Sequence, residues 1–138
     1  MDTFFIFISQ NLVAFTLLVL CLISLVIYES RKGGKKVDSS EATRLINKEG
    51  AVVLDLRTSE EFSVGHIAGS VNTSEEKVEQ QLISLTHPKE KPILLVCKTG
   101  NNSKGVGVSL MKLGYLNVNI VSGGMMTWQG NGMPLSKK

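Results

Sequence analysis

Apolar and polar positions divide the chain into one long apolar segment near the N-terminus and a series of short apolar runs that alternate with amphipathic stretches. Residues 4–28 contain no charged side chain and are apolar over most of their length. At about 1.5 Å per residue, a helix of this length measures about 37 Å, which exceeds the roughly 30 Å of a bilayer's hydrocarbon core. The pattern therefore predicts one N-terminal transmembrane helix that contacts the lipid bilayer through residues 4–28.

A cleaved signal peptide is the alternative interpretation of this segment. Such a peptide has a basic start and a cleavage site of small residues, whereas here Asp2 precedes the apolar run and Tyr28 and Glu29 follow it. We therefore favour a membrane anchor. Four basic residues come directly after the span: Arg31, Lys32, Lys35 and Lys36. Because basic residues stay on the cytoplasmic side, we expect a single-pass protein of the inner (cytoplasmic) membrane, with its N-terminus out and its C-terminal domain in the cytoplasm.

The rest of the chain alternates predicted strands with predicted helices. We expect strands at residue 37 and over 51–54, 93–96 and 118–121, and helices over 39–47, within 57–65, and over 73–85, 103–113 and 125–128. This alternation favours an α/β fold whose parallel sheet is covered on both faces and whose site lies at the carboxyl ends of the strands. The expected organisation is an anchor (residues 1–30), a basic juxtamembrane linker (31–36) and one domain (37–138).

Charge and cysteine content narrow the classes of function. The net charge is +3, and the four juxtamembrane cations account for this excess, so the domain itself is near neutral. Nucleic-acid binding requires a basic face and is not expected, whereas basic residues beside an apolar span suit anionic lipids. Two cysteines and two histidines show no spacing of metal ligands, so we predict neither a metal nor another cofactor.

Residues 93–108 hold the candidate chemistry. An apolar run ends at Cys97, turn-forming residues follow it, and a helical pattern begins at Ser103. The unpaired amides of a helix's first turn favour a thiolate, and a nearby cation such as Lys98 favours it further. We therefore expect Cys97 to be a reactive thiol. The alternative is a small buried residue at the end of a strand, which is a common environment for a free cysteine.

Three separate segments resemble the signatures of the rhodanese-like domain family. Residues 55–62 with 65–72 resemble its first signature, residues 97–101 resemble its active-site loop, and Gly123, Gly124, Trp128, Gly130 and Pro134 resemble its carboxyl-terminal signature. The resemblance runs from about Val37 to Leu135. It implies the three-layer rhodanese-like fold, in which helices flank a central parallel sheet, preceded here by the transmembrane helix.

The resemblance also implies an activity, that of a sulfurtransferase that carries sulfur as a persulfide on Cys97. A thiosulfate or persulfide donor would supply the sulfur, and a thiol or a protein would accept it. The substrate-binding loop would comprise Cys97 followed by Lys98, Thr99, Gly100, Asn101 and Asn102, whose backbone amides would surround the persulfide. Three residues of the first signature are expected to support the site structurally: Asp55, Arg57 and His66.

The last residue of the loop and the residue after it qualify the expected activity. Active single-domain members often have arginine where this chain has Asn102, and asparagine supplies no charge to an anionic donor. A second hypothesis is therefore a catalytically weak or inactive binding or adaptor module at the cytoplasmic membrane face, with a membrane protein as its partner. Ser103 stands where cysteine phosphatases place their phosphate-binding arginine, so phosphatase activity is not expected.

Overall fold

The computed structural model describes residues 1–31 and 33–137, apart from the side chains of Ser30 and Arg31. Lys32, assigned above to the linker, and Lys138, assigned to the domain, lie outside the described residues. The chain divides into two compact units, Met1–Lys32 and Gly33–Lys138. We describe each unit by itself.

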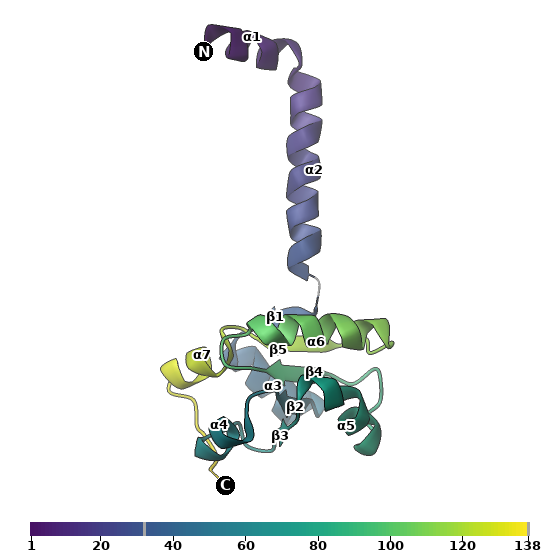
Figure 1. Ribbon diagram of the computed structural model, residues 1–138, viewed down its shortest axis with the longest axis vertical. Helices are drawn as coiled ribbons and strands as arrows, with labels where there is room; N and C mark the ends of the chain where they lie inside the picture. The colour runs from purple at the N-terminus through teal and green to yellow at the C-terminus, as the bar shows by residue number, and fades with distance from the viewer. Residues whose placement is uncertain (32, 138) are drawn as a thin grey trace. The chain divides into compact units, whose positions relative to one another are not determined.

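The N-terminal unit contains two helices, where the sequence predicted one. Helix α1 covers Asp2–Gln10, helix α2 covers Leu12–Arg31, and the two meet at a bend (Figure 1). At the bend, the Asn11 side chain donates a hydrogen bond to the Phe7 carbonyl at 3.0 Å, and such local bonds compete with regular helical structure. Within α2, the 18 residues Leu12–Glu29 are long and apolar enough to cross a membrane, and they form the one such span among the described residues. The candidate span is therefore shorter than the predicted residues 4–28.

The second unit is built on a five-stranded sheet of order β1-β5-β4-β2-β3, in which every pair of neighbouring strands is parallel (Figure 1). The strands are Lys35–Val37 (β1), Val52–Asp55 (β2), Val71–Asn72 (β3), Ile93–Val96 (β4) and Val118–Val121 (β5). Strand β4 is central and wholly buried, as its unbroken apolar run requires. Its register places Leu95 beside Leu54 of β2 and Ile120 of β5. The predicted central parallel sheet is confirmed.

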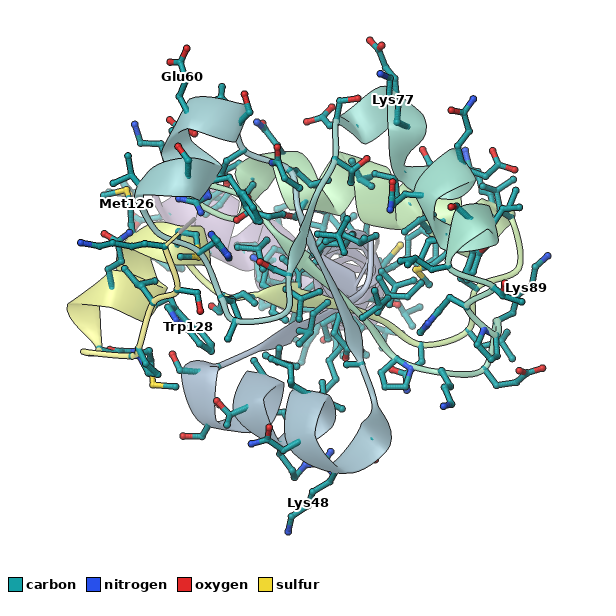
Figure 2. All side chains as sticks on the ribbon, turned by 90° about the horizontal axis from the view of Figure 1, so that it is seen from below. Lys48, Glu60, Lys77, Lys89, Met126 and Trp128 are labelled. Carbon is teal, nitrogen blue, oxygen red and sulfur yellow. The ribbon has the colours of Figure 1, made fainter. Side chains whose placement is uncertain are left out.

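Helices cover both faces of this sheet. They are α3 (Ser39–Glu49), α4 (Ser59–Val64), the 3-10 helix η1 (Glu75–Lys77), α5 (Val78–Ser84), α6 (Asn101–Lys112) and α7 (Gly124–Gly130). Successive β4 side chains point to opposite faces. Leu94 packs in a cluster with Leu45 of α3 and Trp128 of α7, whereas Leu95 belongs to a second cluster with Leu110 of α6. Figure 2 shows four labelled charged side chains pointing away from these clusters: Lys48, Glu60, Lys77 and Lys89.

The domain begins before residue 37, where the sequence analysis placed its boundary. Strand β1 starts at Lys35, so Lys35 and Lys36 pair with β5 in the sheet instead of forming a linker. Gly33 lies close to α6, because a Cβ atom at Gly107 would come within 1.7 Å of the Gly33 carbonyl oxygen. Glycine at these two positions thus permits close packing of the segment against α6.

Candidate active site

Cys97 directly follows β4 at the carboxyl edge of the sheet and is 3% exposed. Helix α6 begins at Asn101, two residues before the predicted start at Ser103. Between them, Gly100 adopts a left-handed φ of 91°, which is strained for any residue with a Cβ atom. This turn directs the Gly100 amide back to Cys97, to which it donates a hydrogen bond with an N–Sγ distance of 2.9 Å.

Burial and hydrogen bonding change the pKa of the Cys97 thiol in opposite directions. Burial has the largest single effect and raises the pKa, because it removes water from the thiolate. The Ser103 hydroxyl and the backbone amides of Ser103, Asn102 and Gly100 lower it, and together they hold the pKa below its ordinary value of 9.0. The first turn of α6 therefore favours the thiolate, in the direction expected from the sequence.

The predicted loop residues differ in what they present to the sulfur. Gly100 and Asn102 act on Cys97 through their backbone amides. Asn102 lies in the first turn of α6, because that helix starts early, and its side chain is exposed. The side chains of three other predicted loop residues are also exposed: Lys98, Thr99 and Asn101. Ser103, predicted to begin the helix and to stand in place of an arginine, is fully buried in the first turn of α6.

The start of α7 holds the same loop through two backbone hydrogen bonds. The Met125 amide donates to the Cys97 carbonyl at 2.9 Å, and the Met126 amide donates to the Lys98 carbonyl at 3.1 Å. A Cβ atom at Gly124 would come within 2.3 Å of the Cys97 carbonyl oxygen, so this approach requires glycine. Gly123 and Gly124 were named from the sequence only as part of the carboxyl-terminal signature, and this contact was not predicted. Consecutive glycines before a helix were the available signal, because they allow two backbones to approach closely.

Asp55 and Arg57 form a buried ion pair after β2, the strand next to β4. The guanidinium donates through Nε to Oδ1 at 3.0 Å and through Nη2 to Oδ2 at 2.7 Å, and the side chains of Arg57 and Asp55 are only 6% and 1% exposed. Nη2 also donates to the Gly65 carbonyl at 2.7 Å. The pair therefore connects the end of β2 to the segment that follows α4.

His66 is held by contacts with the scaffold of the domain. Its ring stacks on that of Phe62 with a centroid distance of 3.8 Å, and its Nδ1 lies 2.8 Å from the Phe62 carbonyl oxygen. Its backbone exchanges two hydrogen bonds with Ser136, which attaches the C-terminal segment to the domain. In the described part of the chain, no group of three His, Cys, Asp or Glu side chains could hold a metal ion.

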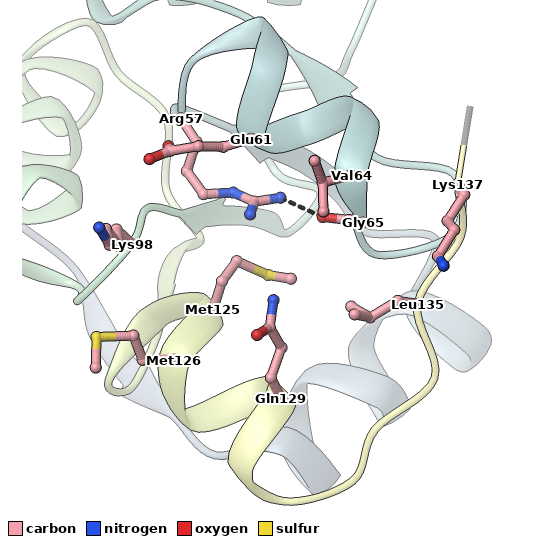
Figure 3. Close-up of a pocket in the computed structure, with 10 residues that line it drawn as sticks. All are labelled: Arg57, Glu61, Val64, Gly65, Lys98, Met125, Met126, Gln129, Leu135 and Lys137. Carbon is pink, nitrogen blue, oxygen red and sulfur yellow. Dashed lines mark hydrogen bonds between the residues drawn. The ribbon is translucent and has the colours of Figure 1, made fainter.

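A pocket of about 500 Å³ lies beside the Cys97 loop (Figure 3). Helix α4, the loop, helix α7 and the C-terminal segment all contribute to its lining. Much of the wall is apolar and comes from Val64, Met125, Met126 and Leu135. Figure 3 shows Lys98 and Lys137 on opposite sides of the pocket. Since Lys98 directly follows Cys97, a molecule in the pocket would lie next to the loop.

Comparison with known proteins identifies the family. The model of the rhodanese-like domain family matches residues 38–131. The chain belongs to the rhodanese-like domain family. Among its relatives, the YibN protein of Escherichia coli (strain K12) is 38% identical over 102 residues, which cover 73% of this chain and 71% of YibN. The thiosulfate sulfurtransferase GlpE of Pseudomonas putida (strain F1) is 33% identical over 95 residues, which cover 69% of this chain and 84% of GlpE.

Solved structures show the same rhodanese-like fold. A rhodanese-related protein from Thermoplasma volcanium superposes with a TM-score of 0.61 at 27% identity, and the match covers 75% of this chain and 99% of that protein. A thiosulfate sulfurtransferase from Pseudomonas aeruginosa gives a TM-score of 0.68 at 20% identity over 75% of this chain and 19% of that one, a likeness of fold alone. The fold and the family predicted from the sequence are confirmed.

Proposed function

We propose that this rhodanese-like protein is a sulfurtransferase that carries sulfane sulfur as a persulfide on Cys97. One observation carries the proposal: the Cys97 sulfur lies against the first turn of α6, with the Gly100 amide at 2.9 Å and a thiol pKa below its ordinary value. A thiolate in this position is both nucleophilic and stabilised. The relationship to GlpE, a thiosulfate sulfurtransferase, supports the same class of reaction.

Two displacements at sulfur complete the proposed cycle. The Cys97 thiolate attacks the outer sulfur of thiosulfate, the S–S bond of the donor breaks, and sulfite leaves with the bonding electron pair. With a persulfide donor, a thiolate leaves instead. An acceptor thiolate then attacks the outer sulfur of the Cys97 persulfide, and the Cys97 thiolate is released. Amides fixed by Gly100 and α6 stabilise the negative sulfur at both stages.

The charges around the loop bear on the choice of donor. Asn102 brings no charge to the sixth loop position, and the cations of the adjoining pocket are Arg57, Lys98 and Lys137. Arg57 is already paired with Asp55, which leaves the two lysines to attract an anion. Thiosulfate, a small dianion, gains little from the apolar walls of a 500 Å³ pocket. We therefore expect an organic persulfide to be a better donor than thiosulfate, and a thiol or a protein cysteine to be the acceptor.

The proposed location is the inner (cytoplasmic) membrane, in a single-pass arrangement with the N-terminus out. Leu12–Glu29 has the length and composition of a span, and the basic residues Arg31, Lys35 and Lys36 follow it, which favours a cytoplasmic domain. A reducing cytosol also suits Cys97, because a persulfide carrier requires a free thiol. Chemical labelling of the domain in intact and in permeabilised cells tests this orientation. A cytoplasmic domain is labelled only after the cells are permeabilised.

A turnover assay tests the proposed function. The full-length protein in detergent is given a donor and an acceptor thiol, and transferred sulfur is measured over time. Cys97→Ser should abolish transfer, because the hydroxyl cannot form a persulfide. Cys21→Ser is the matched control, since Cys21 lies in the candidate span, and it should transfer sulfur at the wild-type rate. Turnover that persists in Cys97→Ser would contradict the proposal.

The exposed, uncharged Asn102 favours a second candidate function, an adaptor module that binds a membrane protein without turnover. In this case the fold would supply a binding surface, and α2 would hold it at the membrane. Cys97→Ser would then leave recovery of the partner from detergent-solubilised membranes unchanged, whereas deletion of residues 1–28 would abolish it. Recovery that does not depend on residues 1–28 would remove the support for this function.

A further inference from the structure

The segment of residues 135–137 supplies two side chains to the pocket beside the Cys97 loop. Leu135 and Lys137 both line this pocket, whereas Ser136, which stands between them, lines a second pocket of about 280 Å³ to which Leu135 also contributes. Alternate side chains of an extended chain point to the same side. One apolar and one cationic side chain of this segment therefore face the same pocket.

Hydrogen bonds and packing hold this segment in place. The His66 amide donates to the Ser136 carbonyl at 2.9 Å, and the Ser136 amide donates to the His66 carbonyl at 2.7 Å. A Cβ atom at Gly65 would lie 3.1 Å from Cδ1 of Leu135, so Leu135 packs directly against this glycine. The residues on either side of Ser136 are thus positioned beside the pocket by the backbone of the domain.

The charged side chains of the pocket differ in whether they already have a partner. Arg57 belongs to the buried ion pair described above, and Glu61 caps the backbone at the start of α4. Among the described residues, no ion pair involves Lys98 or Lys137. These two lysines lie on opposite sides of a largely apolar wall (Figure 3). The complementary molecule is apolar in its middle and anionic at its ends.

We propose that Leu135 and Lys137 select, as the sulfur substrate, a thiol or persulfide whose sulfur is separated from a carboxylate by an apolar body. The sulfur lies at the Cys97 loop, the apolar body packs against Leu135, and the carboxylate pairs with Lys137. This inference rests on the proposed function and narrows its organic sulfur compounds to anionic, apolar ones. The family model matches residues 38–131, so both selecting residues lie beyond that match and membership of the family does not imply this selectivity.

Sulfur transfer from the loaded full-length protein, in detergent, to three acceptor thiols tests this inference. Mercaptohexanoate carries the apolar body and the carboxylate, mercaptohexanol carries the body alone, and mercaptoethanol lacks both. The ratio of two second-order rate constants, taken for each variant, removes effects that are common to all thiols. Lys137→Met keeps an unbranched side chain without the charge, and it should lower the preference for mercaptohexanoate over mercaptohexanol by up to about fivefold, as for an exposed ion pair. Leu135→Ala should lower the preference for mercaptohexanol over mercaptoethanol by about tenfold.

Two variants far from the pocket serve as matched controls. Lys48 is an exposed lysine of α3 that points away from the domain (Figure 2), and Leu113, directly after α6, is 39% exposed, against 38% for Leu135. Lys48→Met and Leu113→Ala should leave both ratios at their wild-type values. Wild-type ratios in Lys137→Met and Leu135→Ala as well would overturn the inference.

Protection of Cys97 from alkylation separates this inference from the proposed function. Hexanoate has the apolar body and the carboxylate but no sulfur, so its binding requires no sulfur transfer. In a Cys21→Ser background, hexanoate should slow the alkylation of Cys97 by iodoacetamide, and Lys137→Met should weaken this protection. If the protein transfers no sulfur, protection that depends on Lys137 rejects only the proposed function, whereas hexanoate that slows both proteins equally, or neither, overturns the inference. If sulfur is transferred, the ratios of rate constants decide.

Discussion

Substitution of Arg57 by alanine would disrupt the buried ion pair of the site. Arg57→Ala leaves the Asp55 carboxylate, which is 1% exposed in the pair, without its guanidinium partner. It also removes the donor to the Gly65 carbonyl. Arg44 provides a matched control, because it forms a comparable pair with Glu41 at 2.6 Å while both side chains remain substantially exposed, at 43% and 33%.

The expected cost follows from the burial of the pair. Removing one partner of a buried ion pair typically costs about 3–5 kcal/mol, since the remaining charge is left without compensation. Asp55 keeps one hydrogen bond, from the Arg57 backbone amide at 3.0 Å, so we expect a loss of about 3 kcal/mol, the lower end of that range. The solvent-exposed pair is screened by water, and Arg44→Ala should leave the free energy of unfolding nearly unchanged.

Urea unfolding of the full-length protein in detergent, followed by Trp128 fluorescence, measures this difference. Trp128 lies in the core of the domain at 3% exposure and is the only tryptophan in the chain, so the signal reports on the domain alone. With a urea dependence of about 1.5 kcal/mol per molar, a loss of 3 kcal/mol lowers the midpoint by about 2 M. Equal midpoints for Arg57→Ala and Arg44→Ala would refute the reasoning.

Three further predictions use the same unfolding assay. Gly107→Ala should destabilise the domain by about 1–3 kcal/mol through overpacking, since its Cβ atom would meet backbone within 1.7 Å, whereas Gly105→Ala, with nothing within 4 Å, should be neutral or stabilising. Thr58→Ala removes the side-chain cap of α4 and should cost about 1 kcal/mol; Ser74→Ala, at a cap without a side-chain hydrogen bond, should cost less. Because the pKa of the Cys97 thiol is lowered in the folded protein, ionisation of this thiol stabilises the folded state. This stabilisation is complete above the thiol's ordinary pKa and is lost as the pH falls through the lowered pKa of the folded protein. The stability of the wild type relative to Cys97→Ser should therefore increase as pH rises toward 9.0, and a difference independent of pH would contradict this sign.

Helices and strands that are determined by residues close in sequence could be predicted from the sequence. The apolar run of β4 identified the central strand, and the helix predicted from residue 39 is α3, which lies between the capping carboxylate of Asp38 and the left-handed Gly50. The bend at Asn11 was not predicted, because one asparagine in an apolar segment is compatible with either a straight or a bent helix. The early start of α6 was missed because Asn101 resembled a turn residue in sequence.

Features of the site that depend on tertiary packing could not be predicted in the same way. Cys97 was recognised from its place between a strand and a helix, and Arg57 was expected to support the site. The complete burial of Ser103 in the first turn of α6 depends on tertiary packing, which its neighbours in sequence do not reveal. The contact between Gly124 and the Cys97 carbonyl likewise joins segments that are distant in the chain.

Intact-mass measurement of the full-length protein after incubation with a sulfur donor tests the central claim most directly. Thiosulfate and an organic persulfide are each supplied, and excess donor is removed before the mass is measured. The account predicts a gain of about 32 Da, one sulfur atom, that is retained in Cys21→Ser, absent in Cys97→Ser and released by an acceptor thiol. The absence of this adduct with both donors, or its persistence in Cys97→Ser, would contradict a persulfide carried on Cys97.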